Sequence, residues 1–239
     1  MSKTVLITGA SRGIGRACAQ VFAQNGYSVA IDYNKSERQA LELAQQLREA
    51  GCDADCFKAD VSKSSEVRAL VDWAMGRFGH IDVLINNAGV SLAGLLTDMT
   101  DTQWAEVRGV CLDGTVYCCR EVLPHMVRRQ SGCIINISSV WGVRGGSYES
   151  GYSAVKAGII GLTLALSKEY APSSIRVNCI APGVIDTDMS RCYDLTALAQ
   201  DTPLGRVGQP EEIARAALFM AQSGFITGQV LGVDGGFGM

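Results

Sequence analysis

A tyrosine and a lysine four residues apart, Tyr152 and Lys156, lie in a segment with helical periodicity. A spacing of four places both side chains on the same face of a helix. A tyrosine alone titrates near about 10, and a neighbouring ammonium lowers that pKa because it favours the phenolate. The pair therefore predicts a general acid for carbonyl reduction and a general base for alcohol oxidation.

Ser139 directly follows an apolar run at residues 133–138, which predicts a strand. Open parallel sheets place ligand contacts beyond the carboxyl ends of their strands. The Ser139 hydroxyl is therefore a candidate to hold a substrate carbonyl oxygen. Each feature alone also has an ordinary structural explanation, because a serine often caps a helix and a tyrosine–lysine spacing of four is frequent on helices.

A glycine-rich turn follows the first predicted strand and opens the first predicted helix. Backbone N–H groups at a helix N-terminus bind a pyrophosphate, and glycines allow the close approach that this requires. The turn predicts a dinucleotide site made by Gly9, Ser11, Arg12, Gly13, Ile14 and Gly15.

The end of the second predicted strand carries conflicting signals for the adenosine ribose. Asp32 could accept a hydrogen bond from a free 2′-hydroxyl, whereas Arg12 could pair with a 2′-phosphate. Asn34, Lys35 and Ser36 follow and suit a phosphate pocket. This favours NADP(H) over NAD(H).

Short apolar runs alternate with longer helical patterns along the whole chain, as in a parallel α/β sheet with right-handed crossovers. The predicted strands are Thr4–Thr8, Ser28–Asp32, Ala54–Ala59, Asp82–Asn86, Cys133–Ser138, Ile175–Ile180 and Gln229–Val233. The predicted helices are Ile14–Gln24, Ser36–Ala50, Ser64–Arg77, Thr102–Arg129, Tyr152–Tyr170 and Glu211–Gln222. The pattern predicts a doubly wound Rossmann-type α/β fold with a seven-stranded parallel sheet and helices on both faces.

No linker or composition shift divides the sequence, so residues 1–239 are expected to form a single domain. Gly26 and Gly51 stand where C-terminal caps of two helices are expected. Residues 183–208 form one long irregular stretch, which predicts a substrate-binding loop.

Composition argues against several classes of protein. Hydrophobic residues make up 47% and charged residues 19%, and the net charge is -3, so neither a disordered chain nor a nucleic-acid-binding protein is expected. Nine cysteines without a C-x-x-C pair and two histidines, His80 and His125, predict no metal site. The start of the chain shows no signal peptide, and no apolar run is long enough for a membrane span, so a cytoplasmic protein is expected.

Taken together, the motifs resemble those of the short-chain dehydrogenase/reductase family over essentially the whole chain. The glycine turn matches the family's TGxxxGxG, and residues 86–89 match its NNAG. Ser139, Tyr152 and Lys156 match its active-site spacing, and Pro182, Gly183, Ile185 and Thr187 match the segment near the nicotinamide.

The resemblance implies roles for further residues. Asp60 and Val61 would contact the adenine, and Asn86, Ala88 and Gly89 would lie along the cofactor. Lys156 would also bind the nicotinamide ribose, while Ile185 and Thr187 would hold the carboxamide next to Pro182 and Gly183. The resemblance also implies a homotetramer.

One position departs from the family pattern. The family usually has an Asn-x-x-Gly step in the helix at residues 102–129, and this chain has Cys111 there, followed by Leu112, Asp113 and Gly114. That asparagine is thought to hold a water in a proton relay, and a thiol is a weaker hydrogen-bonding group. Either another group completes the relay, or the enzyme is slow or tuned to another substrate, or the site binds without turnover.

The substrate has two candidates. The chain is most similar to 3-oxoacyl-(acyl carrier protein) reductases, which implies a 3-oxoacyl thioester and an acyl carrier protein as partner, with Arg128 and Arg129 as a candidate basic patch. Trp141 after Ser139, with Glu149 before Tyr152, also resembles a branch that reduces a 5-aminopentanone group on modified elongation factor P. Glu149 would meet the amine of that substrate.

Two alternatives from other classes remain. A dinucleotide-binding regulatory protein with little or no turnover agrees with Cys111 but not with an intact Ser139, Tyr152 and Lys156. A purely structural subunit agrees with the apolar faces at residues 104–123 and 159–166, although buried core would look the same.

Overall fold

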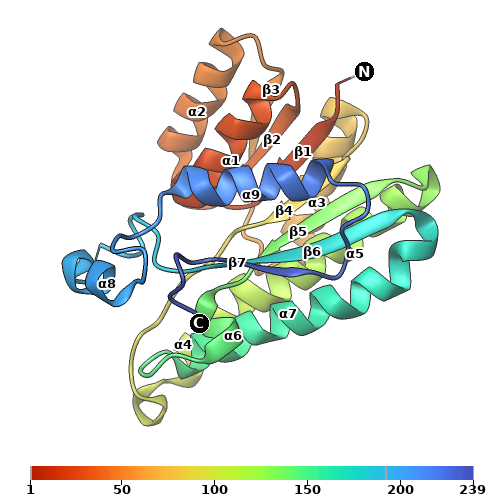
Figure 1. Cartoon of the computed structure of the whole chain (residues 1–239). Helices are drawn as coiled ribbons and strands as arrows, with labels where there is room; N and C mark the ends of the chain where they lie inside the picture. Colours follow the sequence, from red (N-terminus) through yellow and green to blue (C-terminus); the bar gives the residue numbers. More distant parts are fainter. Residues whose placement is uncertain (1, 192, 239) are drawn as a thin grey trace.

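The computed structural model describes residues 2–191 and 193–238, which form one twisted parallel sheet with helices on both faces (Figure 1). Within the described residues the sheet has seven strands in the order β3-β2-β1-β4-β5-β6-β7. The strands are β1 (Thr4–Ile7), β2 (Ser28–Tyr33), β3 (Ala54–Lys58), β4 (Val83–Asn86), β5 (Gly132–Ile137), β6 (Ile175–Pro182) and β7 (Val230–Val233). The predicted doubly wound fold is confirmed.

The helices have the following bounds. They are α1 (Gly13–Gln24), α2 (Glu37–Glu49), α3 (Ser64–Phe78), α4 (Asp101–Arg108), α5 (Gly114–Arg129), α6 (Val140–Arg144), α7 (Ser150–Tyr170), α8 (Leu195–Asp201) and α9 (Pro210–Gln222). None of the helices in the described part of the chain is both long and apolar enough to span a membrane.

Strand alternation divides the core into two layers. Val5 and Ile7 of β1 pack with Phe22 of α1 on the face that α1, α2 and α9 cover. Leu6 between them points the other way and packs with Leu70 of α3, on the face that α3 and α5 cover. Both faces of the central strands are thus apolar, which explains why these runs are almost continuously hydrophobic.

The order of the strands fixes the position of a cleft. Since β1 lies between β2 and β4, the connections leave β1 and β4 in opposite directions. Ligands bind at such a switch point, outside the carboxyl ends of the strands. The residues that end β1, β2, β4, β5 and β6 all meet at this edge.

Three local expectations are corrected. The predicted helix at residues 102–129 is interrupted by a π-helical turn at Gly109–Asp113. Residues 183–208 are not wholly irregular, because Asp194 caps the short α8 by accepting from the Thr196 and Ala197 amides. The short α6 was not predicted, and Ser139 caps it.

Candidate active site

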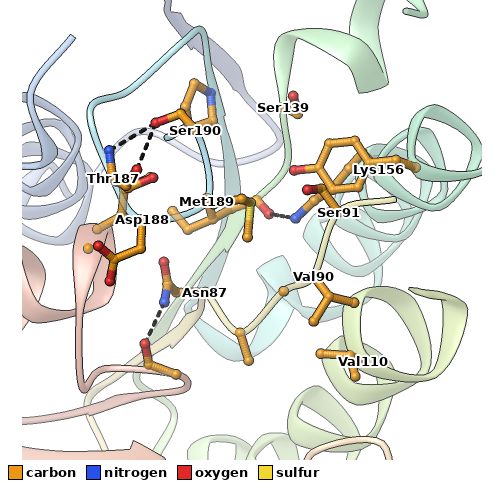
Figure 2. A pocket seen from close by; sticks show the side chains of 18 of the residues that line it. Asn87, Val90, Ser91, Val110, Ser139, Lys156, Thr187, Asp188, Met189 and Ser190 are labelled. Atoms are coloured by element: carbon orange, nitrogen blue, oxygen red, sulfur yellow. Dashed lines mark hydrogen bonds between the residues drawn. The ribbon is translucent and has the colours of Figure 1, made fainter. Parts of the chain in front are cut away.

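A cleft of about 810 Å³ lies at the carboxyl edge of the sheet. The glycine turn forms one end, and the N-terminal part of α7 forms the other. Figure 2 shows Ser139 and Lys156 on one side of it, the segment from Thr187 to Ser190 on the opposite side, and Asn87 below. Residues far apart in sequence therefore face one enclosed space.

Ser139, Tyr152 and Lys156 meet at the inner end of the cleft, as predicted. The Lys156 ammonium lies 5.5 Å from the centre of the Tyr152 ring. It donates to the Ile137 carbonyl at 2.8 Å, which fixes an almost fully buried side chain. The Ser139 hydroxyl accepts from the Trp141 amide at 3.2 Å and keeps its own proton for another partner.

The Tyr152 hydroxyl is protonated at neutral pH. Burial is the largest influence on its pKa and raises it, while Lys156 and the nearby Ser139 hydroxyl lower it. The expected lowering by Lys156 is present, but burial outweighs it, so the net direction is opposite to the prediction. For Lys156, burial lowers the pKa, yet the surrounding Tyr152, Cys111 and Cys179 give a net increase.

This arrangement suits proton transfer to a carbonyl oxygen. Ser139 can donate to that oxygen, and the protonated Tyr152 can supply a proton as negative charge develops on it. The Lys156 ammonium then stabilises the phenolate that remains. In the reverse direction the same tyrosine removes the alcohol proton.

Cys111 does not line the cleft but lies directly behind its wall. Its thiol donates to the Val90 carbonyl at 3.3 Å and accepts from the Val90 amide at 3.4 Å. A Cβ atom built on Gly89 would lie 3.6 Å from the Cys111 sulfur and 3.7 Å from the Lys156 nitrogen. The thiol therefore holds the segment after β4 in place near Lys156.

The glycine turn provides a cradle that side chains would fill. Gly9 has a φ of +61°, and a Cβ atom there would lie 2.9 Å from the Ala88 Cα atom. The Thr8 hydroxyl accepts from the Asn87 and Ala88 amides at 3.0 Å each, which ties the ends of β1 and β4 together. The turn is thus held open and rigid at the N-terminus of α1, so the residues present fit a dinucleotide.

Most of the predicted cofactor residues line the cleft. They are Gly9, Ser11, Arg12, Gly13, Ile14, Asp32, Asn34, Asp60, Val61, Ala88, Gly89, Tyr152, Lys156, Pro182, Gly183, Ile185 and Thr187. Gly15 lies behind it, where a Cβ atom would come within 2.5 Å of the Asn87 side chain, so this glycine lets α1 approach the sheet.

Two predicted cofactor residues also form hydrogen bonds within the protein. Asn86 is buried and donates to the Asn136 side chain at 2.8 Å, whereas Asn87 lines the cleft. Asp32 lines the cleft but is almost fully buried, and its carboxylate accepts from the Gly9 amide at 3.1 Å, so it also anchors the glycine turn. Burial raises the pKa of Asp32 to about 7, although backbone hydrogen bonds oppose that shift.

Two basic side chains line the cleft near the glycine turn, those of Arg12 and Lys35. Arg12, Asn34, Lys35 and Ser36 line it. Arg12 also lies 3.6 Å from Asp188, an exposed contact across the mouth of the cleft. These groups can pair with an anionic substituent on an adenosine ribose.

Comparison with known proteins gives a family for this site. A model described as enoyl-(acyl carrier protein) reductase matches residues 9–238. The 3-oxoacyl-(acyl-carrier-protein) reductase FabG of Chlamydia muridarum is 45% identical and covers 99% of this chain and 97% of its own. The FabG reductase of Staphylococcus aureus is 39% identical, and the match covers 100% of this chain and 99% of the relative.

The chain belongs to the short-chain dehydrogenase/reductase family.

Solved structures agree with this membership. ElxO with NADP bound superimposes with a TM-score of 0.91 at 34% identity and covers 99% of both chains. A tyrosine-to-phenylalanine variant of ElxO with NADPH bound superimposes with a TM-score of 0.92 at 33% identity. As a short-chain dehydrogenase/reductase, the protein is an oxidoreductase that acts on a C=O/CH–OH pair.

The bound nicotinamide supplies the hydride in this family. In this short-chain dehydrogenase/reductase, Lys156 and the segment from Pro182 to Thr187 border the inner end of the cleft, where a nicotinamide would lie. Cys111 keeps a fixed position beside Lys156 at the site where the family usually has asparagine. Asn87, the second asparagine of the NNAG motif, lines the cleft but was not among the predicted cofactor residues.

Proposed function

We propose that the protein is an NADPH-dependent reductase that converts a ketone to a secondary alcohol, with a 3-oxoacyl thioester as its first candidate substrate. The observation that carries this proposal is the meeting of Ser139, Tyr152 and Lys156 in the same cleft as the glycine turn. A regulatory protein or a structural subunit would have no need of a buried lysine held beside a protonated tyrosine.

Two observations support NADPH over NADH. Arg12, Lys35 and Ser36 line the cleft, and the carboxylate of Asp32 in the same lining is held by the Gly9 amide. The ElxO structures were solved with NADP or NADPH. Paired basic side chains favour a 2′-phosphate over a free hydroxyl.

The substrate proposal rests on the FabG relatives, whose names describe them as reductases of 3-oxoacyl groups on an acyl carrier protein. The predicted basic patch does not support it on this chain. Arg129 pairs with Asp82 at 3.0 Å, just before β4, and therefore lies at the edge of the sheet opposite the cleft. Docking of a carrier protein needs another surface, or a neighbouring copy of the chain.

The decisive experiment follows the absorbance of NADPH, then NADH, during incubation of the purified protein with acetoacetyl coenzyme A. We expect turnover with NADPH that falls by about 10²-fold or more in Tyr152→Phe. Tyr117→Phe on α5 is the matched control, because that tyrosine packs against Arg120 outside the cleft. Equal rates in wild type and Tyr152→Phe would refute the assigned mechanism.

A second candidate substrate is a 5-aminopentanone group on modified elongation factor P. The specific observation in its favour is Glu149, whose buried carboxylate lies in the wall of the same cleft. The same assay, run with elongation factor P carrying the ketone, compares the two substrates directly.

A cytoplasmic homotetramer completes the proposal. Exposed apolar side chains on α7 and α9, Leu164 and Phe219, give such an assembly surfaces to bury. Light scattering coupled to gel filtration measures the mass, and a monomer would contradict this part of the proposal.

A further inference from the structure

One carboxylate holds the turn after β7, residues 234–238. The Asp234 side chain accepts from the Gly236 amide at 2.9 Å with one oxygen and from the Gly238 amide at 3.1 Å with the other. The backbone carbonyl of Asp234 accepts from the Phe237 amide at 3.1 Å. Three hydrogen bonds to a single residue therefore fix the backbone on both sides of Phe237, and with it the direction in which this side chain leaves the turn.

This turn supports two walls of the cleft from behind. Figure 1 shows the segment after β7 beside α6, and a Cβ atom at Gly238 would lie 2.9 Å from a methyl group of Val140. At the end of β6, a Cβ atom at Gly183 would lie 2.7 Å from the Asp234 Cα atom. Val140 and Gly183 line the cleft, and residues 234–238 are not among the described residues that do so.

Phe237 packs edge to face on Trp141 of α6. The ring centroids are 5.5 Å apart and the ring planes are inclined by 72°. The indole also packs closely on the backbone of Gly146, because a Cβ atom there would lie only 2.9 Å from the Trp141 ring. Trp141 lines the cleft, whereas Phe237 and Gly146 are not among the described residues that line it. Phe237 can therefore act on the cleft through the position of the indole.

Trp141 lies beside the position where a substrate carbonyl would bind. Its amide donates to the Ser139 hydroxyl at 3.2 Å, and both residues line the cleft. When Ser139 holds a carbonyl oxygen, the substituents on the carbonyl carbon extend into the cleft next to residue 141. A ring that is packed on two sides yields little, because protein interiors are close-packed. The position of the Trp141 ring therefore limits the size of the substituent that fits.

We infer that Phe237 is a positioning residue that holds the Trp141 ring in the cleft wall and thereby restricts the ketone to short substituents on its carbonyl carbon. This inference rests on the proposed ketone reduction and adds a determinant of substrate size to it. Phe237 itself does not touch the substrate. A smaller residue at position 237 would leave the indole free to tilt into the vacated space, which would widen the cleft next to Ser139.

The test compares a long and a short substrate with NADPH. 3-Oxooctanoyl coenzyme A and acetoacetyl coenzyme A differ only in the alkyl group on the reacting carbonyl carbon, which is pentyl in the first and methyl in the second. The measured quantity is the long-to-short ratio of their kcat/KM values. Phe237→Ala should raise this ratio at least about fivefold, the equivalent of about 1 kcal/mol for an aromatic pair. Phe237→Tyr keeps the ring and should stay near the wild-type ratio.

A double-mutant cycle shows whether Phe237 acts through Trp141. Trp141→Ala removes the indole and should raise the long-to-short ratio by itself. Adding Phe237→Ala to Trp141→Ala should then change the ratio by less than about twofold, because two substitutions that act through one group are not additive. Phe225→Ala is the matched control, since it removes a fully exposed ring from the connection between α9 and β7. It should leave the ratio and the Kd for NADPH unchanged.

Failure of this inference differs from failure of the proposed function. An unchanged or lower ratio in Phe237→Ala, or additive effects in the cycle, would overturn the inference while Tyr152-dependent reduction stands. If neither thioester reacts with wild type, the proposed function fails, and the size selection fails with it. Fluorescence then decides the positioning role separately. With the other two tryptophans, Trp73 and Trp104, replaced by Phe, Phe237→Ala should increase the quenching of Trp141 by acrylamide, and unchanged quenching would refute that role.

Discussion

The Cys111 thiol and the Val90 backbone are joined by two reciprocal hydrogen bonds, at 3.3 and 3.4 Å. An asparagine amide carries the same pair of functions, one donor and one acceptor. The Cys111 thiol therefore connects the π-helical turn at Gly109–Asp113 to the segment after β4, although a thiol is a weaker hydrogen-bonding group than an amide. A Cβ atom at Gly89 would lie 3.6 Å from the Cys111 sulfur and 3.7 Å from the Lys156 nitrogen, so we expect this connection to position the backbone next to the lysine.

This connection predicts the effect of two substitutions at Cys111. Cys111→Ala should lower kcat several-fold, because each lost hydrogen bond contributes about 1 kcal/mol. Cys111→Asn should match or exceed the wild-type kcat. Cys52→Ala is the control, since that thiol also donates to a backbone carbonyl, at Tyr27, but lies outside the cleft. Loss of turnover in Cys111→Asn would contradict this interpretation.

The pKa of Asp32 predicts how stability depends on pH. Its folded pKa of about 7 exceeds the ordinary aspartate pKa of 3.8, so between these two values the folded state binds more protons than the unfolded state. Stability should therefore fall as pH rises through this window. Asp32→Asn should remove this loss, on the order of 4 kcal/mol at pH 8 and about 1 kcal/mol at pH 4.5. Thermal unfolding of both proteins at the two pH values measures it, and an equal change in Tm at both would contradict the assignment.

The two basic side chains near the glycine turn predict cofactor preference. A double variant, Arg12→Ala with Lys35→Ala, should raise the Kd for NADPH at least about tenfold and that for NADH much less, because only NADPH carries the phosphate. Fluorescence titration of both cofactors measures this. Lys168→Ala, exposed on α7, is the control. An equal increase in the Kd for both cofactors would show that these residues do not distinguish a 2′-phosphate from a free 2′-hydroxyl on the ribose.

The Thr8 hydroxyl predicts a coupling between stability and cofactor binding. Thr8→Val keeps the shape of the side chain but leaves the Asn87 and Ala88 amides without their acceptor. Unsatisfied groups of this kind cost about 1–3 kcal/mol each. We expect a lower Tm and a higher Kd for NADPH. Thr4→Val, at the other end of β1, should leave the Kd unchanged; an equal change in both variants would contradict the proposed role.

Sequence patterns predicted the sheet because strands and helices depend on local order, and the same patterns placed the candidate catalytic residues Ser139, Tyr152 and Lys156 in one cleft. Continuous apolar runs identify strands buried on two faces, and a spacing of four identifies one face of a helix. The short α6 and α8 lack such a pattern. Their stability comes from single caps, Ser139 and Asp194, which look like ordinary loop residues in sequence.

Strand alternation explains why Asp32 and Asn86 are buried and form hydrogen bonds within the protein. Asp32 falls on the same face of β2 as Ala30, and Asn86 on the same face of β4 as Leu84, both of which pack toward α3 and α5. Counting by two along each strand would have turned both polar side chains inward. The bond between Glu149 and Tyr193 had no such signal, because 44 residues separate them.

The hydrogen atom at Gly146 has an evolutionary consequence. A methyl group there would strike both Trp141 and Glu149, at 2.9 and 3.1 Å. Every glycine codon becomes an alanine codon by one nucleotide change, so a single mutation could reshape the cleft wall at Trp141 and Glu149 while leaving Ser139, Tyr152 and Lys156 untouched. Paralogues that arise by duplication of this gene could thus acquire a different cleft wall in one step and keep the same chemistry.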